Sequence, residues 1–348
     1  MVNQETSNEI RTQPCPACYL CGGQGSSLYE GLRDRLFGAT GNWNLKKCQN
    51  PECGLLWLDS MPVEEDIGKA YQNYFTHQDV TALSTWPHRV YRSIKEGYLG
   101  HKYGFKKESF TKWKHLLGIL IYLHPVRRSG LDYTFMCLPR QHGERLLDVG
   151  CGSGSMLKQM QSLGWCVEGV DVDPIALENA KSKGLKVRLG KLEDQMYLNN
   201  CFDAITMSHL IEHVYDPLQL LRECHRILKP SGHLLVVTPN SESLGHRMFK
   251  DNWLGLDPPR HLHLFTPSAL YQLAERAGFS KPKISTMTRG ANGSFLASRD
   301  IQRTGIHVMD SHQPKFLRIW AEAMSLVEWM ISKANPNIGE EIALVAEK

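Results

Sequence analysis

The chain of 348 residues lacks the features by which secreted, membrane-spanning and nucleic-acid-binding proteins are usually identified. Its polar first residues contain no hydrophobic signal core, so we expect a cytoplasmic protein. The longest notable apolar run, residues 116–123, is interrupted by Gly118 and is far too short to cross a bilayer. The formal net charge of +4 is too small to indicate a nucleic-acid partner. The length allows a full globular core and one extra module.

Two common nucleotide-binding motifs are also missing, although the glycine-rich segment LLDVGCGSG occupies residues 146–154. A dinucleotide fingerprint requires glycine at the sixth position of G-x-G-x-x-G, and here that position is Ser155. The Gly-Lys-Ser/Thr of a phosphate-binding P-loop does not follow either. The segment therefore indicates a ligand other than a phosphate-bearing nucleotide.

What the segment does contain is a predicted strand that ends in an acid, followed by a turn of alternating glycines. Glycine lets the backbone approach a ligand closely. Asp148, just before the turn, would repel phosphate but suits a cation, and Asp171 ends the next predicted strand, where a carboxylate can bind both ribose hydroxyls. A phosphate-free cation with a ribose describes S-adenosylmethionine. The alternatives are a generic glycine-rich turn or a degenerate dinucleotide site. The glycines are Gly150, Gly152 and Gly154.

Ten cysteines in a chain without a secretory signal indicate thiols and metal ligands rather than disulfides. Two pairs near the amino terminus, each followed by glycine, could bring four thiolates onto one ion, and zinc suits such a set. The metal would replace a core that this segment is too short to build. We predict a structural zinc ribbon over residues 1–60, in which Cys15 could replace one ligand; unrelated buried thiols or an iron–sulfur cluster would also account for the cysteines. The predicted ligands are Cys18, Cys21, Cys48 and Cys53.

Residues 61–140 are rich in aromatic and basic side chains and predict a helical linker or lid. Its aromatic residues would either line a substrate site or pack the ribbon against the main domain. Basic residues between Lys102 and Lys114, with Arg127 and Arg128, flank the apolar stretch 116–123. This arrangement is compatible with peripheral contact to an anionic lipid surface or with an anionic substrate. A solvated basic face is the simpler interpretation.

Residues 141–348 alternate between predicted strands and helices, which is typical of a parallel, doubly wound α/β sheet. Predicted strands occupy 145–149, 166–172, 187–189, 202–207 and 234–238. Asp216-Pro217 marks a helix start and Lys229-Pro230 its end. A further helix over 316–331 would pack its apolar side chains against the sheet or form a lid over a hydrophobic acceptor.

Residues 145–280 resemble the class I S-adenosylmethionine-dependent methyltransferases, and most closely the ubiquinone-biosynthesis O-methyltransferases. The segments that carry the resemblance are LLDVGCGSG, GVDVDP, FDAITMSHLIEHVYDP, RILKPSGHLLVVTPN and HLFTPSALYQLAERAGF. The resemblance implies a Rossmann-like seven-stranded sheet with a final antiparallel hairpin, to which residues 342–346 would contribute. It also implies that the three glycines line the cofactor, that Asp171 holds the ribose, that Leu192 and Glu193 flank the adenine, and that Met207 to His209 face the methionyl end.

Catalysis would require alignment of an in-line attack and, for a hydroxyl acceptor, a base or a metal to take up its proton. His209, Glu212 and His213 follow the fourth predicted strand, where such folds present ligands. The ubiquinone-type relatives have E-x-x-E-H there, an arrangement that can bind a divalent cation. His209 replaces the first Glu, and imidazole suits zinc better than magnesium. H-x-x-E-H is also an inverted zinc-protease signature. For His213, the alternative to a catalytic role is a purely structural one.

A second candidate cluster follows the fifth predicted strand, on the rim where acceptors bind. Arg260 would pair with an acceptor phosphate or carboxylate, and His261 would serve as a base. The alternative is a rigid Pro-Pro turn with packing side chains. The remaining members of this cluster are Trp253, Pro258, Pro259 and His263.

Taken together, these patterns favour methyl transfer to a hydroxyl of a small molecule or of a sugar-containing envelope or natural-product intermediate. One alternative is a C- or N-methyltransferase that acts on nucleotide-linked sugars. Another is a ribosomal-RNA methyltransferase with an RNA-binding ribbon. The ribbon is not basic, however, and Lys46 and Lys47 are its clearest basic pair. A zinc-ribbon interaction protein with an inactive cofactor fold is the non-enzyme alternative. The sequence does not indicate an oligomeric state.

Overall fold

A seven-stranded mixed sheet forms the centre of the molecule in the computed structural model, which describes residues 9–72, 86–104, 116–134, 138, 143–309, 311 and 313–348. The strand order is β12-β13-β10-β9-β6-β7-β8. Five strands run parallel, and β13 lies antiparallel between β10 and β12. This order confirms the predicted Rossmann-like sheet with its closing antiparallel hairpin. The strands are β6 (Arg145–Val149), β7 (Cys166–Asp171), β8 (Val187–Leu189), β9 (Phe202–Ser208), β10 (Leu228–Pro239), β12 (Ser280–Met287) and β13 (Glu341–Glu347).

Helices cover both faces of this sheet because successive strand residues point to opposite sides. Leu147 of β6 packs in one core cluster with side chains of α6 and α8, whereas its neighbour Leu146 packs in another with side chains of α4 and α5. Strand β6 is therefore buried from both sides, as its apolar composition predicts. The helices are α4 (Ser155–Ser162), α5 (Pro174–Ser182), α6 (Pro217–Ile227) and α8 (Pro267–Arg276).

Three of these helices begin with a side-chain cap followed by proline. Asp173, Asp216 and Thr266 each accept a hydrogen bond from a backbone N–H of the first turn. The predicted start at Asp216-Pro217 is confirmed. Helix α6 ends earlier than predicted, at Ile227, because Leu228 already pairs with Phe202 as the first residue of β10.

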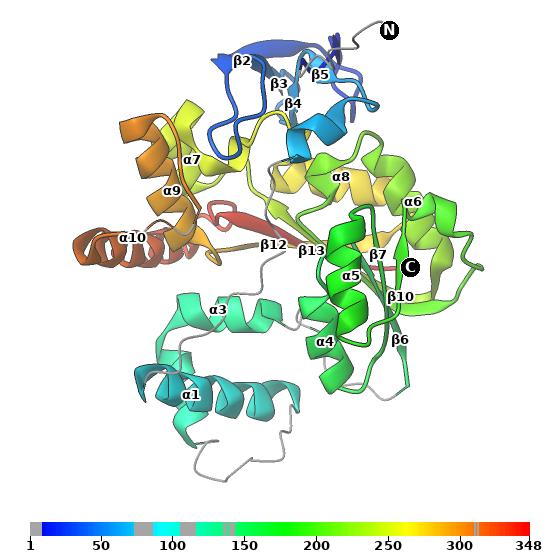
Figure 1. Ribbon diagram of the computed structural model, residues 1–348, viewed down its shortest axis with the longest axis vertical. Helices are drawn as coiled ribbons and strands as arrows, with labels where there is room; N and C mark the ends of the chain where they lie inside the picture. The colour runs from blue at the N-terminus through cyan, green and yellow to red at the C-terminus, as the bar shows by residue number, and fades with distance from the viewer. Residues whose placement is uncertain are drawn as a thin grey trace, which may run out of the picture.

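The amino-terminal segment forms a four-stranded sheet of order β11-β4-β3-β2. Its edge strand, β11, comes from the carboxy-terminal half of the chain, so this sheet joins the two parts of the molecule. Trp43, Leu45 and Leu58 share a core cluster with Leu264 and Phe295. Figure 1 shows this sheet at the top of the molecule. Its strands are β2 (Gly25–Leu32), β3 (Trp43–Cys48), β4 (Leu56–Leu58) and β11 (His263–Leu264); β1 (Thr12–Gln13) pairs with β5 (Met61–Pro62).

The predicted linker begins with the short strand β5, and from residue 67 on its described part is mostly helical. Tyr98 and Tyr103 of this segment are buried in the core cluster that contains Leu146 and Leu157, and both donate hydrogen bonds to Asp132. These aromatic residues thus pack against the main domain; residues 105–115 lie outside the described part. The elements are η1 (Ile67–Tyr71), α1 (Trp86–Tyr103), η2 (Ile119–Leu123) and α3 (Pro125–Thr134).

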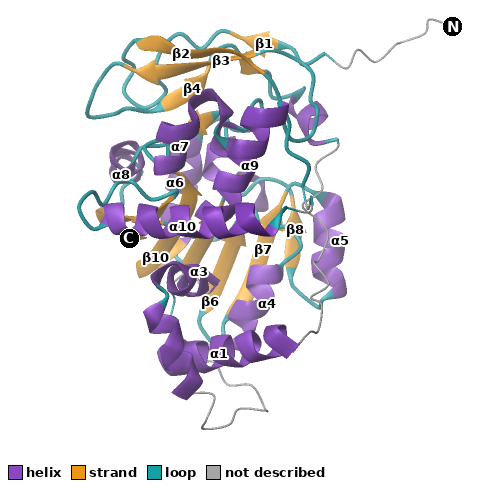
Figure 2. Cartoon of the chain, turned by 90° about the vertical axis from the view of Figure 1, so that its left-hand side faces the viewer, coloured by secondary structure: helices purple, strands orange, loops and turns teal. Residues whose placement is uncertain are grey.

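Two helices lie between β12 and β13 in the chain, namely α9 (Ala291–Thr304) and α10 (Lys315–Ser332). The predicted helix over 316–331 is confirmed, but it packs on α9 rather than directly on the sheet. The ring of Trp320 lies 6.3 Å from that of Phe295, between ring centroids, and the Arg299 guanidinium lies 4.9 Å from the Trp320 ring. Figure 2 shows α10 crossing in front of the strands. Among the described residues, no helix is both long enough and apolar enough to span a membrane.

Candidate active site

The glycine turn connects β6 to α4, and its three glycines all have positive φ: 75° at Gly150, 50° at Gly152 and 75° at Gly154. A Cβ at Gly154 would lie 2.4 Å from Leu185 Cδ1, so packing excludes a side chain there. A Cβ at Gly152 would meet nothing within 4 Å. Gly152 therefore faces open space, where a bound molecule could approach the backbone.

Asp171 ends β7 directly beside this turn. Its carboxylate accepts hydrogen bonds from the backbone N–H of Gly152 (2.7 Å) and of Asp173 (2.9 Å). The structure thus brings together the turn and the carboxylate that the sequence predicts to bind one cofactor. The carboxyl ends of adjacent parallel strands meet at this edge, which is where open α/β sheets bind ligands.

Asp148 is buried at the carboxyl end of β6 and accepts a hydrogen bond from Thr206 Oγ1 at 2.8 Å. Burial raises the pKa of Asp148 to about 7, and the nearby Asp171 carboxylate acts in the same direction. Near neutral pH this carboxyl group is therefore only partly ionised, and a bound cation would favour its ionised form.

This raised pKa predicts a pH-dependent cost to stability that an Asp148→Asn variant would remove. The folded state holds the proton more tightly than the unfolded chain, so stability falls as pH rises from about 4 to about 7. Urea unfolding at pH 5 and pH 8 should show wild type losing about 2–3 kcal/mol relative to the variant. Parallel pH profiles for the two proteins would mean that Asp148 titrates normally.

The remaining predicted cofactor residues differ in exposure. Leu192 and Met207 are buried in the same core cluster as Leu147, and Glu193 is partly exposed at the start of η3 (Glu193–Gln195). Met207 is paired with Val149 at the carboxyl end of β9. Their contacts with a cofactor stay predictions.

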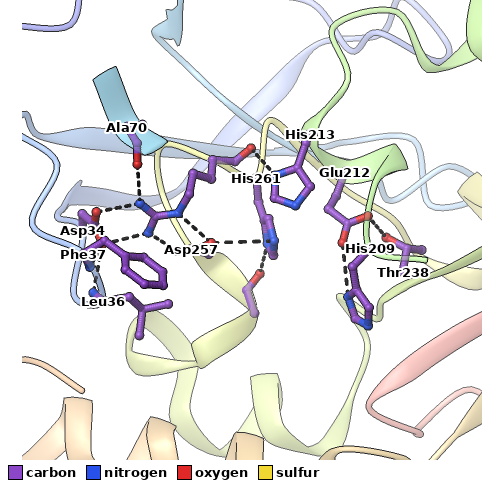
Figure 3. Close-up of polar contacts among 12 residues, drawn as sticks. Asp34, Leu36, Phe37, Ala70, His209, Glu212, His213, Thr238, Asp257 and His261 are labelled. Atoms are coloured by element: carbon purple, nitrogen blue, oxygen red, sulfur yellow. Dashed lines mark hydrogen bonds and ion pairs between the residues drawn. The ribbon is translucent and has the colours of Figure 1, made fainter. Parts of the chain in front are cut away.

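A cluster of acids and histidines follows β9 at the same edge of the sheet. Glu212, on η4 (Ile211–His213), is fully buried; its Oε2 accepts a hydrogen bond from Thr238 Oγ1 at 2.9 Å. His209, with φ of 51°, lies between two carboxylates: its Nδ1 is 3.4 Å from Glu212 Oε1 and its Nε2 is 3.1 Å from Glu341 Oε1. Figure 3 shows the contact with Glu212.

The charges in this cluster shift one another's ionisation. Burial acts to lower the pKa of His209, but its contacts with Glu212 and Glu341 prevail and raise it. Burial acts to raise the pKa of Glu212, but His209, His213 and His261 prevail and lower it to about 2. Glu212 is therefore a carboxylate and His209 an imidazolium at neutral pH.

His213 and His261 lie side by side, with ring centroids 4.7 Å apart. His213 Nδ1 is 3.0 Å from the Arg260 carbonyl oxygen, and His261 Nδ1 is 2.8 Å from that of Gly255. Because a carbonyl only accepts, each Nδ1 carries the hydrogen and each Nε2 keeps its lone pair when the ring is neutral. Burial and the neighbouring His261 lower the pKa of His213 to about 4, so that ring is neutral at pH 7.

One ligand atom each from Glu212, His213 and His261 lies within 4.8 Å of the other two. Glu212 Oε1 is buried and accepts no well-formed hydrogen bond in the described part of the chain; its ion-pair partner, His209 Nδ1, lies 3.4 Å away. Two imidazoles and one carboxylate are a donor set that suits zinc, manganese or ferrous ions. The residues present therefore fit a divalent cation, although the group contains His261 and not His209, which stands at the first position of the E-x-x-E-H motif.

Arg260 corrects a prediction. Its guanidinium is fully buried and donates hydrogen bonds to Asp34 (2.8 and 2.9 Å), to Asp257 (3.0 Å from Nε) and to the Ala70 carbonyl oxygen (3.1 Å). The Phe37 ring lies 4.7 Å from the Arg260 Cζ (Figure 3). Because two carboxylates already neutralise this charge, Arg260 is not available to pair with an anionic acceptor. Its carbonyl oxygen instead orients His213.

Sequence reasoning missed several partners in this network. Asp34 and Tyr71 come from the amino-terminal part of the chain, and Tyr71 Oη lies 3.0 Å from His213 Nδ1. Glu341 begins the last strand. These residues are far from the motif in sequence, and no local pattern marks them. Only Asp257 lies close enough in the sequence, three residues before Arg260, for its ion pair with Arg260 to be expected.

The four predicted zinc ligands also come together. Cys18 Sγ is 3.7 Å from Cys53 Sγ, and Cys21 Sγ is 3.4 Å from Cys48 Sγ; one ligand atom from each of the four lies within 4.8 Å of the others. A tetrahedral zinc ion with Zn–S bonds of about 2.3 Å holds its sulfurs about 3.8 Å apart. The four thiols therefore fit zinc. Cys15 is not a member of this group.

Comparisons with known proteins agree with this geometry. A family model described as "Methyltransferase domain" matches residues 124–282. Ubiquinone biosynthesis O-methyltransferase of Alkalilimnicola ehrlichii is 33% identical over 137 residues, which cover 37% of this chain and 56% of that protein. The protein of the same name from Xanthomonas oryzae pv. oryzae is 38% identical over 125 residues, 34% of this chain and 51% of its own length.

The matched region thus spans a little over half the length of these curated relatives. It contains the glycine turn, Asp171 and the acid–histidine cluster, on a seven-stranded sheet with an antiparallel hairpin, as the resemblance implies. The chain therefore contains a methyltransferase domain over residues 124–282, and this domain is similar to those of the class I S-adenosylmethionine-dependent methyltransferases.

Proposed function

We propose that this protein transfers the methyl group of S-adenosylmethionine to a hydroxyl oxygen of a small-molecule acceptor. The observation that carries the proposal is that the glycine turn with Asp171 and the cluster of Glu212, His213 and His261 follow strands of the same sheet at its carboxyl edge. The relatives named as ubiquinone biosynthesis O-methyltransferases support oxygen as the methylated atom. A more specific version of this proposal is that the hydroxyl belongs to a sugar-containing acceptor.

In this proposal the first part of the site holds the cofactor. Gly152 leaves room for close approach, Asp171 binds the ribose hydroxyls, and Asp148 favours a positive charge nearby. S-adenosylmethionine, when bound, supplies an electrophilic methyl group on a sulfonium. The residues of this chain have to align the acceptor oxygen with that methyl group and exclude water.

The second part of the site takes up the acceptor proton. As the new O–CH₃ bond forms, the electron pair of the S–CH₃ bond stays on sulfur and the hydroxyl proton must leave. His261 or His213 can accept this proton on Nε2, because hydrogen bonds to carbonyl oxygens hold the hydrogen of each ring on Nδ1. The alternative is a divalent cation, which would lower the pKa of a bound hydroxyl. Its ligands would be Glu212, His213 and His261.

The amino-terminal segment has a structural part in this proposal. Cys18, Cys21, Cys48 and Cys53 would hold zinc with no open coordination position for chemistry. The proposed division of the chain remains a ribbon over 1–60, a helical segment over 61–140 and the methyltransferase domain over 141–348. The contact of Tyr71 Oη with His213 Nδ1 would make the helical segment contribute to the site.

Calorimetric titration with S-adenosylmethionine, S-adenosylhomocysteine and NAD tests the cofactor first. Micromolar binding of the first two alone is the expected result, and absence of binding would refute the proposal. An acceptor panel of phenols, sugars and their hydroxyl-blocked analogues then tests the methylated atom. Continued turnover of a blocked analogue would contradict O-methylation.

Asp171→Ala should weaken binding of S-adenosylmethionine about 100-fold, because the ribose hydroxyls lose a carboxylate partner; at about 1.4 kcal/mol per tenfold this is close to 3 kcal/mol. Glu178→Ala is the matched control, since it removes an exposed acid from the helix that follows. Its affinity should equal that of wild type. Equal affinities of all three proteins would show that the ribose is bound elsewhere.

A further inference from the structure

Helix α10 has an apolar stripe on its outer face. Its inner face buries Leu317, Ala321 and Glu328. The opposite face exposes large side chains: Phe316 is 65%, Ile319 69% and Met330 52% exposed. Spacings of three and four residues put all members of the stripe on one side of the helix. The members are Phe316, Ile319, Ala323, Leu326 and Met330.

Basic residues accompany this stripe along one edge. Lys315, Arg318 and Lys333 are exposed and, by helical spacing, lie beside the apolar side chains. The one exposed acid of the helix, Glu322, is 3.8 Å from Arg127 of α3. The charge next to the stripe is therefore positive.

A second exposed apolar group lies on η2. Ile119, Leu120 and Leu123 of η2 are 55%, 48% and 80% exposed, and η2 leads directly into α3. The contact of Arg127 with Glu322 brings α3 against α10, and Figure 2 shows the two helices next to each other on the near side. The apolar stripe of α10 with its charged edge is the kind of exposed surface that usually marks a binding site.

We propose that the outer face of α10 binds the surface of a bilayer that contains anionic lipids. The helix lies parallel to the membrane plane, with Phe316, Ile319, Leu326 and Met330 inserted at the boundary between headgroups and acyl chains. Lys315, Arg318 and Lys333 contact the acidic headgroups. An exposed helix with an apolar stripe, a basic edge and an aromatic side chain, here Phe316, has the composition of an interfacial helix.

Charge argues against a second copy of the chain as the occupant. In a parallel pair of α10 helices Lys315 would face Lys315 and Lys333 would face Lys333, and in an antiparallel pair Lys315 would face Lys333. A stable dimer also buries about 800 Å² on each partner, which is more than the few side chains of this stripe can supply. An anionic surface instead neutralises the lysines.

Flotation with lipid vesicles tests the proposal, using the full chain without cofactor, so the result does not depend on the proposed methyl transfer. Wild type should bind vesicles of phosphatidylcholine and phosphatidylglycerol at low salt, and phosphatidylcholine vesicles much more weakly. Ile319→Ser with Leu326→Ser should weaken binding at least about tenfold. Met196→Ser with Leu198→Ser is the control, because these residues are 85% and 79% exposed in the loop before β9.

Circular dichroism and thermal unfolding establish that both double variants are folded. A third variant, Lys315→Gln with Arg318→Gln, should reduce the preference for phosphatidylglycerol. Wild type that fails to bind, or an α10 variant that binds as well as the control, overturns the proposal. A dimer of wild type in sedimentation equilibrium that the α10 variant loses would also overturn it and assign this face to a second copy.

Discussion

Arg260→Met should destabilise the protein by about 3–5 kcal/mol, because it leaves two buried carboxylates without their positive partner. The Arg260 guanidinium is fully buried and bridges Asp34, from the amino-terminal segment, to Asp257, on the loop that leads to His261. Its charge holds the pKa of Asp34 below the ordinary value, despite burial. The stabilisation is therefore present above the ordinary carboxyl pKa and is lost as pH falls through the lowered one.

Urea unfolding at pH 7 measures the effect. Arg260→Met combined with Asp34→Asn should be less destabilised than the sum of the single variants, since one uncompensated charge is removed with its partner. Arg11→Met is the matched control: Arg11 also contacts a carboxylate through two nitrogens, that of Asp66, but is largely exposed. Its midpoint should stay close to wild type. A wild-type midpoint for Arg260→Met would mean that the buried pair does not form.

Cys18→Ser should release zinc from the amino-terminal segment and unfold it. Three thiolates and a hydroxyl bind zinc far more weakly than four thiolates, and a structural zinc site contributes its binding free energy to folding, about 10–16 kcal/mol for zinc-finger peptides. Because β11 of the carboxy-terminal half completes the ribbon sheet, the change should also lower the midpoint of thermal unfolding of the main domain.

Zinc content after gel filtration, measured by mass spectrometry, should fall from one ion per chain to near zero. Cys15→Ser is the matched control, because Cys15 is close in sequence but outside the group of four. It should keep its zinc. Loss of zinc from Cys15→Ser together with retention by Cys18→Ser would transfer the ligand role to Cys15.

Features that depend on neighbouring residues were predictable. Positive φ at Gly150, Gly152 and Gly154 follows from what glycine permits, and the caps at Asp173 and Asp216 follow from side chains that reach their own helix. The alternation of strands and helices is likewise a local pattern. The cysteine pairs belong to this class too, because each pair lies within one turn of the chain.

The misassigned residue shows where local reasoning ends. Arg260 follows two prolines on the rim of the sheet, a position from which an arginine could contact an acceptor. Its partner Asp34 is 226 positions away in the chain, and no spacing indicates that pairing. The pattern of α10 has the same limit: it predicted a helix, but the stripe left exposed depends on how α9 packs against the other face.

The amino-acid sequence alone was enough for the α/β class, the cofactor turn, the thiol set and the acid–histidine motif, because each depends on backbone preferences and side chains within a few residues. The tertiary structure alone decided that Arg260 is a buried bridge, that Tyr71 and Glu341 contact the histidines, and that β11 joins the ribbon sheet. These contacts join segments that only the packed core brings together, and burial then determines which charges are neutralised within the protein and which remain free to bind.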